Sequence, residues 1–256
     1  PGKHPAEKLG AMGTVRCGRA RYRGDLRLGG FTPMTTVDYP GQLAAVVFCQ
    51  GCPWRCRYCH NGHLVPARRD QGIAWNQVKA LLDRRRGLLD AVVFSGGEPT
   101  LQASLRSAME GIKAMGFRIG LHTAGPYPER LRPLLPSLDW VGLDIKALPE
   151  DYADVTRVPG SGERAWESLG LLIEAGVELE VRTTLVPGWD TVAHIRDLIV
   201  ALSHAGVENY VVQECRTATM LDPSIASANV TGDLPAEIRE MGAARFLRFA
   251  VRQARP

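Results

Sequence analysis

The chain has 256 residues, of which 45% are hydrophobic and 23% are charged, and its formal net charge is +4 at pH 7. These values fit a globular protein with enough apolar residues for a core, and they exclude a disordered tail, a collagen-like chain and a small disulfide-stapled scaffold. No apolar run approaches the roughly 20 residues that a transmembrane helix needs, and no hydrophobic signal segment opens the sequence. We therefore expect a cytoplasmic protein without a membrane partner.

The positive charge is concentrated at the two ends of the chain. Residues 1–28 contain seven Lys or Arg against two acidic residues, and residues 239–256 contain five Arg against one Glu, so the stretch between them carries a net charge of −5. A nucleic-acid-binding protein more often combines basic and aromatic residues on its folded body. We therefore interpret residues 1–28 as a basic, irregular N-terminal extension and expect no nucleic-acid partner.

Short apolar segments alternate with helical patterns from residue 43 onward. The predicted strands are runs bounded by Gly, Pro or Asp, as is typical of strands buried on both faces. They are residues 43–49, 91–95, 118–123, 140–145, 179–185 and 209–213. The helical patterns that follow them cover residues 75–86, 101–115, 127–135, 163–175, 191–205 and 235–252.

Six strand–helix units predict an α/β fold with a parallel sheet and right-handed crossovers. Because six units are fewer than the eight of a complete barrel, the pattern favours a partial (β/α)6 TIM-like barrel. A doubly wound sheet is the alternative, since alternation alone does not separate the two. The sequence shows no linker, so we expect residues 29–256 to form a single domain.

Function in parallel α/β folds gathers at the carboxyl ends of strands. The first predicted strand is followed by Cys52, Cys56 and Cys59, with the spacing C-x3-C-x2-C. Three thiolates on one loop can bind three irons of a [4Fe–4S] cluster, which leaves the fourth iron open to an incoming ligand with an amine and a carboxylate. We therefore predict that these three cysteines are metal ligands.

Cys49 ends the first predicted strand and extends the pattern to C-x2-C-x3-C-x2-C. This longer pattern leaves a second interpretation open, a non-catalytic zinc-binding module. Paired zinc ligands normally lie farther apart than three residues, so we favour a role for Cys49 as a small buried hydrophobic residue. The sequence indicates no partner for Cys17 or Cys215.

Two further features accompany the cysteine loop: Tyr58 precedes its last cysteine, and Gly96-Gly97-Glu98-Pro99 follows the second strand. Together they resemble the radical S-adenosylmethionine (SAM) superfamily. Four more stretches are similar to those of activating enzymes of glycyl-radical proteins. They are Thr35-Thr36-Val37-Asp38-Tyr39-Pro40-Gly41, Cys59-His60-Asn61, Asp144-Ile145-Lys146 and Val186-Pro187-Gly188. Over roughly residues 29–215 the chain most resembles the activators of anaerobic ribonucleoside-triphosphate reductase.

The resemblance implies a [4Fe–4S] cluster and SAM as cofactors. It implies reductive cleavage of SAM to methionine and a 5′-deoxyadenosyl radical, which takes a hydrogen atom from a glycine of the partner reductase. It also implies a low-potential electron donor such as flavodoxin. Two alternatives within the superfamily remain open, action on another glycyl-radical protein and action on a small molecule.

The resemblance also implies roles for individual residues. The cluster would be ligated by Cys52, Cys56 and Cys59, and the adenine of SAM would lie near Tyr58, His60 and Gln213. The methionine amine of SAM would be received by Gly96, Gly97 and Glu98. The ribose or carboxylate of SAM would be met by Asp144, Lys146 and Arg182. One departure concerns His122, which stands where some activating enzymes have an Asp. The resemblance therefore gives no support for a cation site there.

Overall fold

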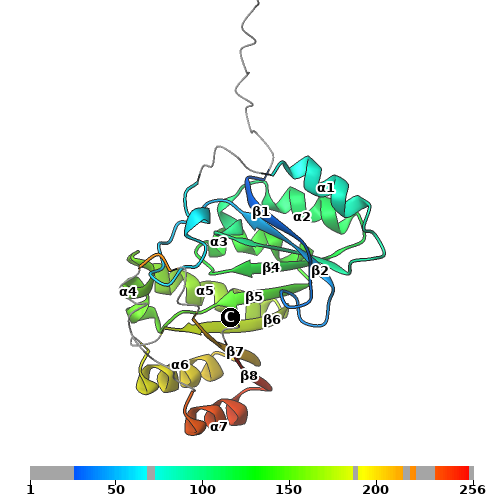
Figure 1. Ribbon diagram of the computed structural model, residues 1–256. Helices are drawn as coiled ribbons and strands as arrows, with labels where there is room; N and C mark the ends of the chain where they lie inside the picture. Colours follow the sequence, from blue (N-terminus) through cyan, green and yellow to red (C-terminus); the bar gives the residue numbers. More distant parts are fainter. Residues whose placement is uncertain (1–25, 68–72, 187–189, 216–219, 223–233, 254–256) are drawn as a thin grey trace, which may run out of the picture.

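A single eight-stranded sheet runs through the molecule, with helices packed along it (Figure 1). The computed structural model describes residues 26–67, 73–186, 190–215, 220–222 and 234–253. The strands are β1 (Leu28–Thr35), β2 (Ala44–Cys49), β3 (Ala91–Gly96), β4 (Arg118–Thr123), β5 (Trp140–Asp144), β6 (Glu178–Leu185), β7 (Asn209–Glu214) and β8 (Arg248–Arg252). They lie side by side in chain order, and β1 is antiparallel to β2 while every later pair is parallel.

At least one α-helix connects each pair of parallel strands. The helices are α1 (Trp75–Asp83), α2 (Leu105–Lys113), α3 (Pro128–Leu131), α4 (Tyr152–Thr156), α5 (Ser161–Glu174), α6 (Val192–His204) and α7 (Ala236–Arg245). Short 3₁₀ helices occur at η1 (Gly62–Leu64), η2 (Pro99–Leu101), η3 (Arg132–Ser137) and η4 (Pro149–Asp151). This arrangement confirms the partial (β/α)6 barrel, because a doubly wound sheet would reverse its strand order. Within the described residues, no helix combines the length and the apolar composition needed to cross a membrane.

The structure differs from the predicted elements at both ends of the sheet. Leu26 and Leu28 fall in the range assigned to the extension, yet both are buried in the main core and β1 begins at Leu28. Residues 1–25 lie outside the described residues. At the other end, the helix predicted over residues 235–252 stops at Arg245, and residues 248–252 form β8. Their alternating burial has the period of two that a strand requires, but five residues are too few to stand out from the preceding helical pattern.

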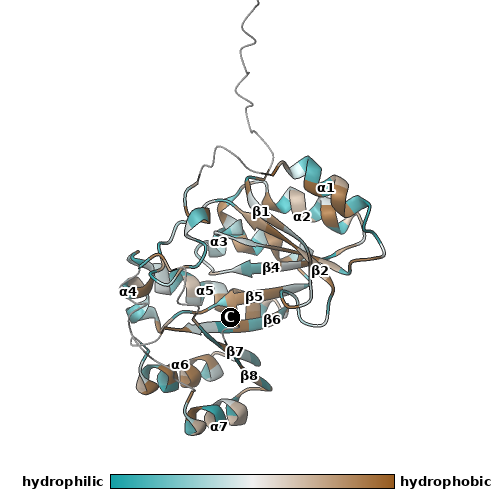
Figure 2. Cartoon of the chain, viewed as in Figure 1, coloured by the Kyte–Doolittle hydropathy of each residue, from teal (hydrophilic) through white to brown (hydrophobic). Residues whose placement is uncertain are grey.

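Side chains from alternate strand positions fill two separate apolar regions. Ala45, Val47 and Cys49 of β2 face the large core between the sheet and the helices. Ala44 and Val46 face the inside of the partial barrel, where they pack with Tyr39, Ala91, Val93 and Trp140. In Figure 2, hydrophobic residues are prominent in β1, β2 and β5, and the helices carry both hydrophobic and hydrophilic residues. Both faces of the strands are therefore covered, and the barrel interior is filled below the carboxyl edge.

We predict that Phe246→Ala lowers the free energy of unfolding by about 3–5 kcal/mol, because it leaves a cavity between α7 and the sheet. Phe246 is 5% exposed and its ring lies 5.0 Å from Tyr210 and 6.2 Å from Phe249. The neighbouring Leu247 is 77% exposed, so Leu247→Ala is the matched control and should change stability by less than ~0.5 kcal/mol. Urea unfolding measures both. Equal, small effects would show that β8 and α7 do not belong to the cooperative core.

Candidate active site

The loop that follows β2 is held at its beginning by hydrogen bonds to its own later part. The backbone amide of Gly51 donates to the Leu64 carbonyl at 2.7 Å, and that of Cys52 donates to the Val65 carbonyl at 3.1 Å. The buried side-chain amide of Gln50 donates to two further carbonyls of the same segment. These bonds close the loop into a compact turn that carries the cysteines.

Cys52, Cys56 and Cys59 are half-buried free thiols on this loop. Burial raises the pKa of all three, that of Cys52 to about 12, and the nearby Glu98 adds to the increase at Cys52. The thiols are protonated at neutral pH without metal, so metal binding releases protons.

The thiols do not form a site for a single metal ion. Across the residues that the structure describes, no three His, Cys, Asp or Glu side chains form such a site. A [4Fe–4S] cluster requires a different arrangement, because each thiolate binds its own iron. Cys49 lies apart from this function, fully buried in the main core, and burial followed by the nearby Glu98 raises its pKa. Its role is the hydrophobic one that the sequence favours.

The end of β3 touches the beginning of the cysteine loop, backbone against backbone. Gly97 donates to the Cys49 carbonyl at 2.9 Å, and Glu98 donates to the Gly51 carbonyl at 2.8 Å. A Cβ at Gly96 would collide with the backbone of Cys49, and one at Gly97 with the backbone of Gly51. Gly96 also has a φ of +116°, which favours glycine. The glycine pair is therefore needed to hold the loop against the sheet.

The Glu98 carboxylate is 1% exposed and accepts hydrogen bonds from four protein donors. They are the amide and hydroxyl of Thr100, the Thr123 hydroxyl and the Ala124 amide, at 2.6–3.0 Å. Burial raises the pKa of Glu98, although these bonds oppose the increase. The carboxylate thus ties the end of β3 to the end of β4. This positioning role was not foreseen from the sequence, where Glu98 is expected to meet an amine.

Lys146 links the end of β5 to the cysteine loop. Its ammonium nitrogen lies 3.5 Å from Asp144 Oδ2 and 5.5 Å from the centre of the Tyr58 ring, and its side chain is only 8% exposed. Burial alone would lower the pKa of Lys146, but Tyr58, Asp144 and Cys56 outweigh it and raise the pKa well above its usual value. Lys146 is therefore a permanent positive charge beside the thiols.

Tyr152 of α4 connects Asp144 and Lys146 to the cysteine loop. Its hydroxyl accepts from the Lys146 amide at 3.0 Å and donates to the Asp144 carbonyl at 3.3 Å. Its ring meets Trp54 of the cysteine loop edge to face, with 5.8 Å between the ring centres. The two residues predicted to bind ribose or carboxylate, Asp144 and Lys146, are therefore joined to the loop through a residue that sequence reasoning missed.

Arg182 belongs to a charged layer inside the barrel. Its Nε donates to Glu180 at 2.8 Å, its Nη2 lies 3.1 Å from His122 Nε2, and its guanidinium stacks on Trp140. Arg252 of β8 holds the same Glu180 carboxylate through two bonds. Arg182 is predicted to meet a ligand carboxylate, but its guanidinium already contacts Glu180, His122 and Trp140. These contacts favour a supporting role below the ligand over direct contact with it.

The motif at residues 35–41 forms the floor under this layer. The Tyr39 ring stacks on Trp140 at 5.0 Å, and the Asp38 carbonyl oxygen lies 2.8 Å from His122 Nε2. On the opposite side of its ring, His122 Nδ1 lies 3.3 Å from the hydroxyl of Ser95, next to Gly96. Burial and the nearby Arg182 hold the pKa of His122 well below its usual value. His122 is therefore a neutral residue that connects the Asp38 carbonyl to the Ser95 hydroxyl.

The remaining predicted residues lie on the same edge of the sheet. Gln213, near the end of β7, donates to the Thr184 hydroxyl of β6 at 2.8 Å. His60 follows the last cysteine and is half-buried. Gln102 was not predicted, although it lies just beyond Glu98; its buried amide bonds the backbone of Arg27 and of Gln50. Pro187 and Gly188 lie outside the described residues.

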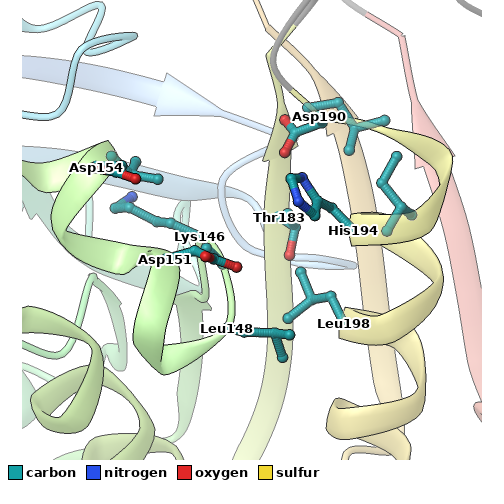
Figure 3. A pocket seen from close by; sticks show the side chains of 12 residues that line it. Lys146, Leu148, Asp151, Asp154, Thr183, Asp190, His194 and Leu198 are labelled. Atoms are coloured by element: carbon teal, nitrogen blue, oxygen red, sulfur yellow. The ribbon is translucent and has the colours of Figure 1, made fainter.

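A small pocket opens beside Lys146, between η4–α4, β6 and α6 (Figure 3). Asp190 and His194 lie on its α6 side, and Asp151 and Asp154 lie on the opposite wall. Its volume is about 90 Å³, whereas pockets for drug-sized ligands begin at roughly 300 Å³. It is therefore a minor cavity next to the site.

Comparisons with known proteins agree with this geometry. Residues 46–199 match the Radical SAM superfamily profile, which is more than half of the chain. A proposed glycyl-radical enzyme activating enzyme of Methanocaldococcus jannaschii is 26% identical, over 84% of this chain and 90% of that protein. The pyruvate formate-lyase-activating enzyme of Clostridium pasteurianum is 32% identical, over 63% of this chain and 69% of that enzyme.

A solved structure shows the same fold. Streptococcus suis SuiB bound to S-adenosylmethionine superposes with a TM-score of 0.61 at 13% identity, over 80% of this chain. The chain spans 48% of the length of SuiB. At this identity, the likeness concerns the fold alone.

We predict that Gly97→Ala lowers the free energy of unfolding by about 1–3 kcal/mol, because the added methyl forces two backbones apart. Gly111, inside α2, has nothing within 4 Å of its Cβ position, so Gly111→Ala should raise stability by up to ~1 kcal/mol. Urea denaturation of the two variants gives the comparison. A Gly97→Ala protein as stable as the Gly111→Ala protein would contradict the close backbone contact.

The lowered pKa of His122 predicts a specific acid sensitivity. The unfolded chain protonates this residue near pH 6.5, while the folded protein resists protonation. Its contribution to stability is therefore present above that pH and is lost as the pH falls, by at most about 1.4 kcal/mol per unit. His122→Gln should lose stability less steeply than the unaltered chain between about pH 6.5 and pH 5. Parallel curves from urea unfolding at several pH values would refute the buried neutral state.

Proposed function

Since the chain belongs to the radical SAM superfamily, and within it to the activating enzymes of glycyl-radical proteins, we propose that it generates a glycyl radical on a partner protein. Its cofactors are a [4Fe–4S] cluster and SAM. The observation that carries the proposal is the meeting of three free thiols, the Gly96-Gly97 backbone and the Asp144–Lys146 pair at one edge of the sheet.

The residues of this edge fit the two cofactors. Cys52, Cys56 and Cys59 supply three thiolates, and three thiolates leave one iron of a [4Fe–4S] cluster without a protein ligand. The Tyr58 hydroxyl is buried, and within the described residues it has no hydrogen-bond partner, so it can bond a ligand without giving up a protein contact. Lys146 supplies a fixed positive charge for a carboxylate or ribose oxygen.

The chain's own side chains orient these groups and close the site from below. When bound, the cluster and SAM supply the one-electron cleavage that gives methionine and a 5′-deoxyadenosyl radical, which takes a hydrogen atom from glycine. Glu98 fixes the backbone beside the thiols. The stacked rings of Tyr39 and Trp140, with Arg182 above them, fill the barrel beneath. A partner's glycine loop therefore has to approach from the carboxyl edge.

For the partner, we propose anaerobic ribonucleoside-triphosphate reductase. Support comes from the resemblance to its activators over roughly residues 29–215. A second candidate is a pyruvate formate-lyase, because relatives from Clostridium pasteurianum and Escherichia coli that are 31–32% identical are named for its activation. A flavodoxin-like donor would supply the electron in either case.

The cysteine assignment predicts a clear difference between two cysteine variants. After anaerobic reconstitution, the unaltered chain should hold about four irons. Cys56→Ala should lose most of this iron and its SAM cleavage, because one ligand is missing. Cys49→Ala should keep both, since Cys49 lies in the core. Iron analysis and an assay of 5′-deoxyadenosine formation measure these two properties. The assignment would be contradicted by a chain that cleaves SAM without iron, or by equal loss of iron and SAM cleavage in both variants.

Transfer of deuterium tests the partner. Each candidate partner protein is prepared with α-deuterated glycine and, in a parallel sample, with ordinary glycine, and both are incubated with the chain, SAM and a reductant. With the true partner we expect deuterium in 5′-deoxyadenosine from the labelled sample. From the unlabelled sample we expect an EPR doublet, because the remaining α-hydrogen of the glycyl radical splits its signal. Deuterium transfer from pyruvate formate-lyase alone would replace the first candidate by the second. SAM cleavage without transfer from either protein would contradict both partner proposals and favour another glycyl-radical protein or a small-molecule substrate.

A further inference from the structure

A short segment from the C-terminal part of the chain lies along the cysteine loop. Residues 220–222, the orange segment above α4 in Figure 1, lie beside the loop that follows β2. The Leu221 amide donates to the Cys59 carbonyl at 3.2 Å, and the Asp222 amide donates to the Arg57 carbonyl at 2.9 Å. Two backbone hydrogen bonds, one on each side of Tyr58, therefore hold the segment against the loop.

An ion pair reinforces the two backbone bonds. Arg57 Nε lies 2.8 Å from Asp222 Oδ2, and each side chain is 27% exposed. The two residues are 165 positions apart in the chain. A partly exposed pair contributes little to overall stability, so its geometry points to a local role at the loop.

The opposite side of the loop is held by α4. Arg55 and Arg57 donate their backbone amides to the carbonyls of Thr156 and Val155, at 3.0 and 3.1 Å. Between Arg55 and Cys59, the bond from the Cys59 amide to the Cys56 carbonyl, at 3.0 Å, stays within the loop. The conformation of the cysteine-bearing stretch is thus set from two sides, by α4 and by residues 220–222.

Residues 220–222 have anchors of their own. The Cys215 thiol, at the end of β7, lies 3.5 Å from the Met220 sulfur, and Cys215 packs with Tyr58 in a small apolar cluster. The Leu221 side chain lies next to Gly62 of η1. The segment is therefore fixed to β7 at one end and to the cysteine loop along its length.

We propose that residues 220–222 are a strap that holds the cysteine loop in its ligating conformation, and that Asp222 is the positioning residue of the strap. The inference rests on the proposed function, since it concerns the cluster that Cys52, Cys56 and Cys59 would bind. Asp222 acts through Arg57, and the Leu221 amide beside it bonds the Cys59 carbonyl. Partners that orient ligands in this way strongly affect metal retention and the properties of the site.

The test uses the full chain in four forms: unaltered, Asp222→Ala, Asp222→Glu and Glu129→Ala. The Glu129→Ala control removes an ion pair of the same 2.8 Å length, Arg164–Glu129, with more exposed side chains (49% and 54%). Each form is reconstituted anaerobically, and three properties are measured. They are the rate of iron release to a chelator, the EPR spectrum of the reduced cluster with SAM, and the thermal midpoint of the metal-free protein.

We expect Asp222→Ala to release iron about 10-fold faster than the unaltered chain and to show an altered EPR spectrum, with a thermal midpoint like that of Glu129→Ala. Asp222→Glu, which keeps the carboxylate, should restore much of the slow release. If Asp222→Ala matches Glu129→Ala in iron release and spectrum, or differs only in thermal midpoint, the strap is refuted. If the unaltered chain holds no iron, the proposed function fails, and this inference fails with it.

Discussion

The site depends on one close contact, where the backbone of Gly96 and Gly97 lies directly against the backbone of Cys49 to Gly51. No side chain fits between these two strand ends, so the cysteine loop leaves the sheet at a fixed point and in a fixed direction. The buried Glu98 carboxylate secures the contact by binding donors at the end of β4. Three successive strand ends are thereby locked together before any cofactor binds. This explains physically why a Gly-Gly-Glu stretch and a cysteine loop occur on neighbouring strands.

Electrostatics complete the arrangement. Burial raises the pKa of the three thiols and of Glu98, whereas Tyr58, Asp144 and Cys56 raise the pKa of Lys146 and keep it charged. Deeper in the barrel, the single Glu180 carboxylate pairs with the guanidinium groups of both Arg182 and Arg252. Next to the thiols, the positive charge of Lys146 lies where three thiolates and an iron–sulfur cluster would bring negative charge.

Much of this could be predicted from the sequence, and the reasons are local. Short apolar runs predict the central strands, and the cysteine spacing predicts the loop. Both patterns can be recognised because each lies within about a dozen consecutive residues. What could not be predicted depends on contacts between distant parts of the chain. Asp222 reaches Arg57 across 165 positions, and Asp38 reaches His122 across 84. The resemblance implies ligand contacts for Glu98 and Arg182, and the sequence does not show the protein groups that these two side chains bind. β8 was read as helix because its five residues directly follow a helical pattern.

The central proposal is that Cys52, Cys56 and Cys59 would ligate three irons of a [4Fe–4S] cluster and leave its fourth iron open to SAM. Electron–nuclear double resonance of the reduced cluster tests it most directly, with SAM carrying ¹⁵N in its amino group and ¹⁷O in its carboxylate. We expect hyperfine coupling between the reduced cluster and both labels in the unaltered chain, because SAM would bind the open iron. A cluster without coupling from either label, or one with a fourth cysteine ligand, would contradict it.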